Sequence, residues 1–246
     1  MMPSKWDFFR FPWESFPDCI IHADEKRVRG HASYHAAKTG DSDAAFELAR
    51  TFLNDHCLAQ IKQLEKIKQD SITLVSAHAL EREGVNAIPE AMAELLGEHL
   101  GWDVEHQVVQ TNIVSHTKAD GFSRLAKQAA FEGDVESGQN YLLVDDFIGQ
   151  GGTLANLRGW ILHSGGQVVG ATVLTGKPYS AKLSVEISQI HELEQKHGED
   201  LRQWWRNRFG FDYDCLTSSE ARYLIRTPSA DRIRDRIVTA VQERSG

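Results

Sequence analysis

The chain has 246 residues, of which 41% are hydrophobic and 25% are charged. This length and composition suit one α/β domain with additions. The net charge of −8 excludes general binding to the nucleic-acid backbone as the default function. Three widely spaced cysteines, Cys19, Cys57 and Cys215, predict neither a disulfide framework nor a zinc site. The lack of an export signal, and of an apolar stretch long enough to span a membrane, leads us to expect a cytoplasmic protein without membrane contacts.

The first 70 residues predict an arm followed by helices. Residues 1–30 are rich in aromatic residues and prolines, which is typical of an irregular arm packed across another surface. From His31 to Asp70 the apolar residues recur at helical spacing, and Asp41 stands where it can cap one of these helices. We therefore expect residues 1–70 to form an N-terminal arm and helical segment on the core.

Residues 71–178 alternate between strand and helix patterns, with a polar segment at 112–138 that has a short helical centre. The expected strands are Ser71–Ala77, Val104–Thr111, Tyr141–Val144 and Gln167–Leu174, and the expected helices are Ala87–Leu100 and Thr153–His163. Such alternation favours right-handed crossovers. It predicts an α/β fold with a doubly wound, mostly parallel sheet covered by helices on both faces.

Residues 179–246 predict a C-terminal helical appendage. The expected helices are Leu183–Arg208, Ser218–Ile225 and Ala230–Glu243. Thr217 and Glu220 have the spacing of a capping box. The run Trp204–Arg208 combines aromatic and basic residues, as single-strand nucleic-acid binders do, but we favour a helix that packs its tryptophans inward.

The strongest functional signal is the segment Tyr141–Leu154. Its apolar strand is followed by Asp145 and Asp146, at the carboxyl end where open α/β sheets bind ligands. Two neighbouring carboxylates can accept hydrogen bonds from two adjacent ribose hydroxyls. The glycines of Gly149–Thr153 then allow a tight loop whose N–H groups, with the start of the next helix, suit a phosphate.

The segment is less compatible with a purely structural turn, a P-loop or a dinucleotide-binding loop. A glycine-rich turn between strand and helix can be purely structural, but the whole run is more specific than a lone GxG. There is no GxxxxGK[ST] motif, and Leu154 stands where a dinucleotide loop needs its third glycine. Thr153 can donate its hydroxyl to a ligand and cap the helix. The spacing therefore predicts a site for a sugar 5-phosphate.

The segment resembles the motif by which type I phosphoribosyltransferases bind 5-phosphoribosyl 1-pyrophosphate (PRPP). Upstream, Glu81–Asn86 before a helix, and Arg124 followed by Phe131–Gly138, resemble the ComF-type branch of that family. The resemblance covers Ile72–Gly176. It implies a type I phosphoribosyltransferase-like core with a flexible hood at residues 112–138, and a transferase of nucleotide metabolism that acts as a glycosyltransferase on PRPP.

The resemblance also implies a role for each matching residue. Asp145 and Asp146 would hold the ribose hydroxyls, and Mg²⁺ would be bound through the substrate and these two carboxylates, without dedicated ligands. The 5-phosphate would lie on Gly149, Gln150, Gly151, Gly152 and Thr153. The pyrophosphate would meet Ala77, His78 and Arg82, while the hood would supply Lys118 and Arg124 as positive charges over the leaving group.

Departures from the family pattern leave the reaction open. Small hydroxyl residues are usual where Gly149 and Gln150 stand, and Phe147 is bulkier than usual. An alternative is therefore a non-catalytic regulator that senses PRPP or a nucleotide, and a weaker one is an accessory of DNA uptake or defence. The partner we expect is a small phosphoribosyl ligand, with neither membrane nor nucleic acid. A homodimer is compatible with the sequence.

The histidines give weaker signals. His31 and His35 have the i, i+4 spacing of a metal pair on a helix, but no third ligand lies near them in the sequence. His78 and His116 fall in segments where a solvated loop accounts for a histidine without a functional role. We therefore expect no dedicated metal ligands.

Overall fold

The computed structural model describes residues 8–242 except 69–70, 78–79, 82–83 and 113–119, with the backbone alone for 65–68, 80–81 and 84. Its centre is a five-stranded sheet of order β1-β9-β8-β2-β5, in which every neighbouring pair is parallel. The strands are β1 (Ile20–Ala23), β2 (Ile72–Ser76), β5 (Val104–Glu105), β8 (Asn140–Ile148) and β9 (Gln167–Gly176). The predicted parallel α/β sheet is confirmed.

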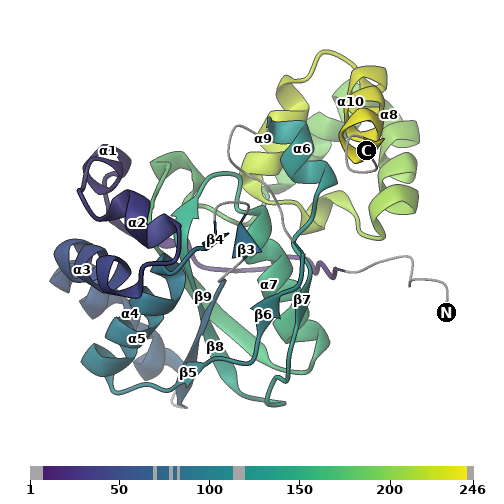
Figure 1. Cartoon of the computed structure of the whole chain (residues 1–246). Helices are drawn as coiled ribbons and strands as arrows, with labels where there is room; N and C mark the ends of the chain where they lie inside the picture. The colour runs from purple at the N-terminus through teal and green to yellow at the C-terminus, as the bar shows by residue number, and fades with distance from the viewer. Residues whose placement is uncertain (1–7, 69–70, 78–79, 82–83, 113–119, 243–246) are drawn as a thin grey trace, which may run out of the picture.

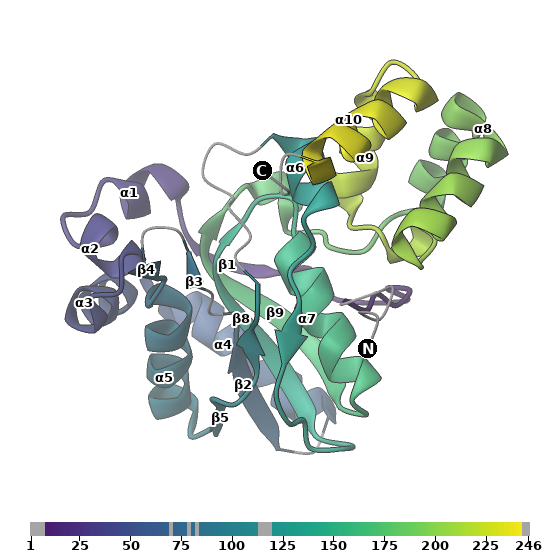
Figure 2. The ribbon, with the colours of Figure 1, turned by 45° about the vertical axis from the view of Figure 1, so that its right-hand side comes forward.

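Helices cover both faces of this sheet (Figures 1 and 2). One face carries α3 (Ser42–Phe52), α4 (Asp55–Lys68) and α5 (Ile88–Leu100), and the other carries α7 (Gly152–His163). Side chains of β8 alternate between the two layers because successive residues of a strand point to opposite faces. Leu142 and Val144 pack with α3 and α5, whereas Leu143 packs with α7.

In the described part of the N-terminal arm, residues 8–13 lie against α7. Phe9 stacks on His163 of α7 with ring centroids 3.6 Å apart, and Trp13 is buried. Gly159 permits this close approach, since a Cβ there would lie 1.8 Å from the carbonyl oxygen of Phe9. The expectation of an irregular segment up to residue 30 is wrong, because Ile20–Ala23 pairs with β9 as an edge strand.

Two short helices follow β1 at the carboxyl edge of the sheet, and the predicted helical pattern beyond them is confirmed. These are α1 (Glu25–Arg29) and α2 (Tyr34–Lys38). Asp41 caps α3, as predicted, by accepting a hydrogen bond from the N–H of Ala44 at 3.0 Å.

A second group of helices packs around its own apolar core, which we call the helical unit: α6 (Gly121–Ala126), α8 (Ile187–Phe209), α9 (Ser218–Arg226) and α10 (Ala230–Gln242). Figure 1 shows it at the upper right. Phe122 and Leu125 of α6 share this core with Trp205. Trp205 is fully buried, which confirms that α8 packs its tryptophan face inward. The short helix of the expected hood therefore packs with the C-terminal helices.

Smaller elements differ from the predictions. The expected strand Val104–Thr111 divides into β5 and β6 (Val109–Gln110), and β6 pairs antiparallel with β7 (Phe131–Glu132). A second antiparallel pair, β3 (Leu80–Glu81) and β4 (Gly84–Val85), lies in the segment expected to be a loop. Two single turns of 3-10 helix, η1 (Pro178–Ser180) and η2 (Tyr213–Cys215), flank α8. Within the described residues, no helix is both long and apolar enough for a membrane crossing.

Candidate functional site

A cleft of about 500 Å³ opens at the carboxyl edge of the sheet, between α1 and α2 on one side and the helical unit on the other. It brings together most of the predicted site residues: Ala77, Arg124, Asp145, Asp146, Gly149, Gln150, Gly151, Gly152 and Thr153. The predicted residues His78, Arg82 and Lys118, and the weighed His116, lie outside the described residues. Further wall residues were not placed in the site by sequence reasoning, among them Arg29, Tyr34, His35, Lys38 and Lys127.

The two carboxylates are neighbours in a strand and therefore have different surroundings. The sequence predicts that this strand ends at Val144, but β8 continues to Ile148 because β9 pairs with it over that length. Asp145 and Asp146 thus project to opposite faces of the sheet. Asp146 accepts a hydrogen bond from Lys38 of α2 at 3.1 Å. Asp145 accepts one at 2.7 Å from the N–H of Asp146.

Burial dominates the electrostatics of Asp145. It raises the pKa of this carboxyl well above its usual range, and the charge of Asp146 adds to the rise. Burial also raises the pKa of the nearby Cys19 thiol, which favours its neutral form. The site therefore pairs a carboxyl that resists ionisation with a carboxylate that is bound to Lys38.

The glycine loop leads directly into α7 and leaves its start open. Gly151 is the N-cap residue, with φ of 80°, and no side chain caps the helix. Thr153 lies in the first turn instead, so its predicted capping role is wrong. The first N–H groups of a helix have no intrahelical partners, and here they lie at a cleft wall. Together with the helix dipole, they form a site suited to an anion.

Two buried polar atoms beside this loop have no hydrogen-bond partner among the described residues: Nε of Arg124 and Oε1 of Gln150. Arg124 comes from α6, and its Nη1 lies 3.2 Å from where a Cβ on Gly149 would stand. Buried polar atoms are nearly always hydrogen-bonded. An orphaned guanidinium nitrogen next to an open helix start is therefore an arrangement that an anionic ligand can complete.

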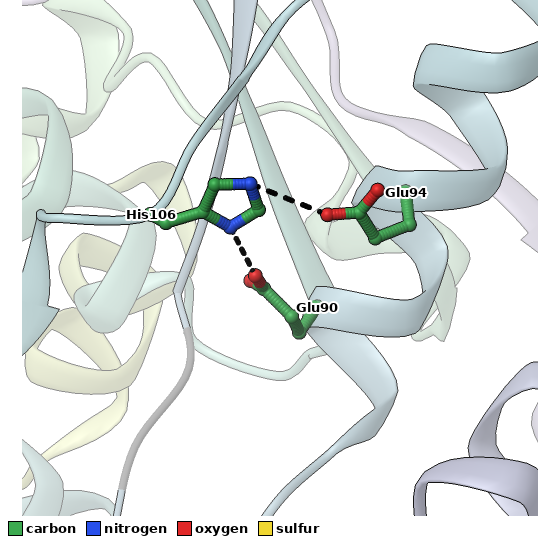
Figure 3. Close-up of side chains that lie close together, drawn as sticks. All are labelled: Glu90, Glu94 and His106. Carbon is green, nitrogen blue, oxygen red and sulfur yellow. Dashed lines mark hydrogen bonds and ion pairs between the residues drawn. The ribbon is translucent and has the colours of Figure 1, made fainter.

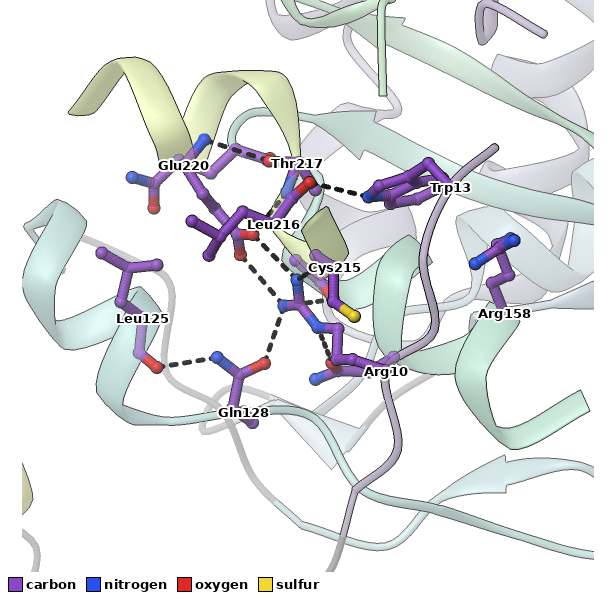
Figure 4. A network of polar contacts seen from close by, with 12 residues as sticks. Arg10, Trp13, Leu125, Gln128, Arg158, Cys215, Leu216, Thr217 and Glu220 are labelled. Atoms are coloured by element: carbon purple, nitrogen blue, oxygen red, sulfur yellow. Dashed lines mark hydrogen bonds and ion pairs between the residues drawn. The ribbon is translucent and has the colours of Figure 1, made fainter. Parts of the chain in front are cut away.

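A network of polar contacts among residues distant in the sequence lies beside the loop, and Figure 4 shows Arg10, Gln128, Thr217 and Glu220 in it. Thr217 donates a hydrogen bond from Oγ1 to the carbonyl oxygen of Gln150 at 2.5 Å. Arg10 of the arm donates to both carboxylate oxygens of Glu220, at 2.8 and 3.0 Å, and also to Asn156 of α7. The only sequence signal for this network was the capping-box spacing of Thr217 and Glu220, which is confirmed.

A separate cluster of titratable side chains lies outside the cleft (Figure 3). His106 contacts Glu90 through Nδ1 at 2.6 Å and Glu94 through Nε2 at 3.3 Å. Each ring nitrogen faces a different carboxylate, so the ring bridges two acids of α5. Across the described ranges this is the one cluster with metal-ligand spacing, and it includes neither His31 nor His35.

The chain is similar in sequence to two known proteins that are longer than it is. No family model matches the chain. It is 39% identical over 234 residues to Protein TraN of Escherichia coli, covering 95% of this chain and 52% of that protein. It is 35% identical over 161 residues to an uncharacterized protein of Haemophilus influenzae, covering 65% of this chain and 34% of that protein. The chain thus spans about half of the first relative and a third of the second.

Among solved structures, the chain is similar to adenine phosphoribosyltransferases. The enzyme of Leishmania tarentolae aligns with a TM-score of 0.35 and 13% identity, covering 85% of this chain and 98% of that chain. The enzyme of Rhodothermus marinus aligns with a TM-score of 0.32 and 19% identity, covering 50% of this chain and 69% of that chain. Similarity at this level establishes no activity, and the ComF-type branch stays a prediction.

Proposed function

We propose that the cleft binds PRPP with Mg²⁺, or a related ribose 5-phosphate ligand, and that the protein transfers the phosphoribosyl group with release of pyrophosphate. One observation carries the proposal. At a single sheet edge, two adjacent carboxyls lie next to an uncapped helix start and to an Arg124 guanidinium whose Nε has no partner among the described residues. The carboxyls can bind the hydroxyls of a small sugar phosphate, and the helix start and Arg124 can bind its phosphate.

The phosphate end of the ligand would lie on the loop. The N–H groups at the start of α7, the Thr153 hydroxyl and Arg124 would donate hydrogen bonds to the phosphate oxygens. The ribose would lie on β8, with one hydroxyl donating to Asp146. A protonated Asp145 could donate to the other hydroxyl, since burial disfavours its charge.

The carboxyls of the site offer oxygen ligands of the type that Mg²⁺ prefers, but Lys38 already contacts Asp146. We therefore place Mg²⁺ mainly on the phosphates of the ligand and on water, where it would neutralise the departing pyrophosphate. The bond between the anomeric carbon and the pyrophosphate oxygen would break through an oxocarbenium-like ribose. A nitrogen of the acceptor base would form the new bond to that carbon and lose its proton to the departing pyrophosphate or to water. Arg124 and Lys127 line the cleft, and with Lys118 of the hood they would stabilise the leaving charges.

A non-catalytic sensor of PRPP or of a nucleotide is the second candidate. It is favoured by the absence of hydroxyl side chains at Gly149 and Gln150, which removes donors that a tightly held phosphate would use.

We also propose a division of the chain into a ligand-binding core at residues 71–178, with the hood at 112–138, flanked by residues 1–70 and 179–246. A cytoplasmic location and a small-molecule partner belong to the same proposal.

Release of pyrophosphate tests the proposed reaction. The protein would be incubated with Mg²⁺, PRPP and each of a panel of bases that includes adenine, and pyrophosphate would be measured with a coupled assay. Release with at least one base, and its loss in Asp146→Asn, is the expected result. Binding of PRPP without release for every base would replace the transferase by the sensor. Absence of both binding and release would refute the proposal.

A further inference from the structure

Residues of the C-terminal segment pack closely against the glycine loop. A Cβ placed on Gly151 would lie 2.7 Å from Cδ2 of Leu183 and 3.4 Å from Cγ2 of Thr217. A Cβ on Gly152 would lie 3.1 Å from Oε1 of Glu220. Leu183, Thr217 and Glu220 are all buried. The loop therefore has no room to shift toward these three residues unless the C-terminal segment moves as well.

Thr217 joins the loop to the start of α9 with a single hydroxyl group. Its Oγ1 accepts a hydrogen bond from the N–H of Glu220 at 3.0 Å, which closes the capping box. The same oxygen donates its one hydrogen to the carbonyl of Gln150 at 2.5 Å. A threonine hydroxyl has one hydrogen to donate, so this side chain fixes the loop and the helix cap together.

The helical unit also reaches the loop from the cleft side. Arg124 comes from α6, whose apolar residues Phe122 and Leu125 pack in the same core as α9 and α10. Its guanidinium lies against Gly149. One packed group of helices thus contacts the loop at two points, through Arg124 at Gly149 and through Thr217 at the Gln150 carbonyl.

We propose that anion binding to the phosphate loop is coupled to the docking of the helical unit, and that Thr217 is the positioning residue that couples them. An anion bound to the loop draws Arg124 inward and fixes the Gln150 carbonyl, and both effects stabilise the docking of the helical unit. Because coupling between two equilibria is reciprocal, a loosely docked helical unit weakens anion binding to the same extent. The inference rests on the proposed function, because it concerns the same phosphate site.

Thr217→Val and Thr217→Ser separate the hydroxyl from the shape of the side chain. Valine keeps the size but donates no hydrogen bond, whereas serine keeps the hydroxyl. Thr227→Val is the matched control. Thr227 is a buried threonine at the other end of α9, and its Oγ1 donates a hydrogen bond within that helix, to the carbonyl of Tyr223. The measurements are the affinity for Mg²⁺-PRPP and for ribose 5-phosphate, and hydrogen exchange of the intact protein with and without these ligands.

In the wild type, we expect ligand to slow exchange in the loop and also in residues 216–226. Thr217→Val should weaken affinity by about tenfold, as expected for losing one buried hydrogen bond, and should abolish the ligand-dependent protection of 216–226. Thr217→Ser and Thr227→Val should behave as the wild type. Unchanged affinity in Thr217→Val, or ligand protection confined to the loop of the wild type, would overturn the inference.

Failure of the proposed function gives a different result. If the wild type binds neither ligand, the phosphoribosyl site is refuted, and exchange without ligand decides whether Thr217 holds the loop. Faster exchange at residues 150–154 in Thr217→Val, restored by Thr217→Ser, would support the positioning role. Equal exchange in all variants would overturn it.

Discussion

Replacing Glu220 by glutamine removes the negative partner of Arg10 with little change in size. The side chains of this pair are only 1% and 3% exposed, and Arg10 donates to both oxygens of Glu220. In the variant, an amide NH2 faces a guanidinium that has donors alone. Removing one partner of a buried ion pair costs about 3–5 kcal/mol because the remaining charge is left unpaired.

The cost should be visible in both urea and thermal unfolding followed by circular dichroism. In a chain of this size, each kcal/mol lowers Tm by roughly 2–4 °C. A loss of about 3–5 kcal/mol therefore lowers the Tm of Glu220→Gln by roughly 6–20 °C. Glu199→Gln is the control, because Glu199 is 66% exposed and lies 3.6 Å from Arg206, and exposed pairs contribute about 0–1 kcal/mol.

The double variant Arg10→Met, Glu220→Leu separates the unpaired charge from lost packing. It should recover only part of the stability that the single variant loses. Neither charge remains buried, but Asn156 and the N–H of Thr217 lose their hydrogen-bond partners. A stability of Glu220→Gln equal to that of Glu199→Gln would refute this account of the network.

Three further predictions concern single side chains. Asp145→Asn should be more stable than the wild type at pH 7 and equal to it near pH 4. Burial raises the folded-state pKa of Asp145, so the wild type loses stability as pH rises above the unfolded value of about 3.9. A lower free energy of unfolding of the variant in urea at pH 7 would contradict this. Asp212→Asn should lower the free energy of unfolding by about 1 kcal/mol at pH 7 after allowance for solvent screening. Although burial alone raises the pKa of Asp212, hydrogen bonds from Arg202 and Arg206 lower it to about 2, so the loss should vanish as pH falls from about 4 to 2. A loss that does not depend on pH would contradict the assignment. Arg124→Ala should weaken binding of ribose 5-phosphate roughly 10–100-fold, the effect of losing charge-assisted hydrogen bonds, whereas the exposed Arg226→Ala should leave it unchanged in calorimetry.

The sequence predicts the sheet well where strands are apolar and bounded by turns. It fails at Ile20–Ala23, because four residues after an aromatic arm carry too little pattern to show a strand. It also fails at the end of β8, because Asp145 and Asp146 interrupt the apolar run although β9 still pairs there. Glu105-His106-Gln107 is polar, and the structure separates β5 from β6 at this point.

The same limits apply to the candidate site. The carboxyls and the glycine loop are contiguous in sequence, so local spacing is enough to predict them. Lys38 and Arg10 come from the first 40 residues and Thr217 from the last 30. These three residues reach the site only because the two ends of the chain pack around it. No local sequence pattern predicts such contacts.

Titration of the protein with Mg²⁺-PRPP in an isothermal calorimeter tests the central claim most directly. Wild type, Asp146→Asn and the control Asp43→Asn, which alters an exposed carboxyl on α3, would be compared at one pH and salt concentration. The account predicts saturable binding at one site per chain, unchanged in the control and weakened at least about tenfold in Asp146→Asn, as expected when a charged hydrogen-bond acceptor is lost. No binding to the wild type, or equal affinity in all three proteins, would contradict it.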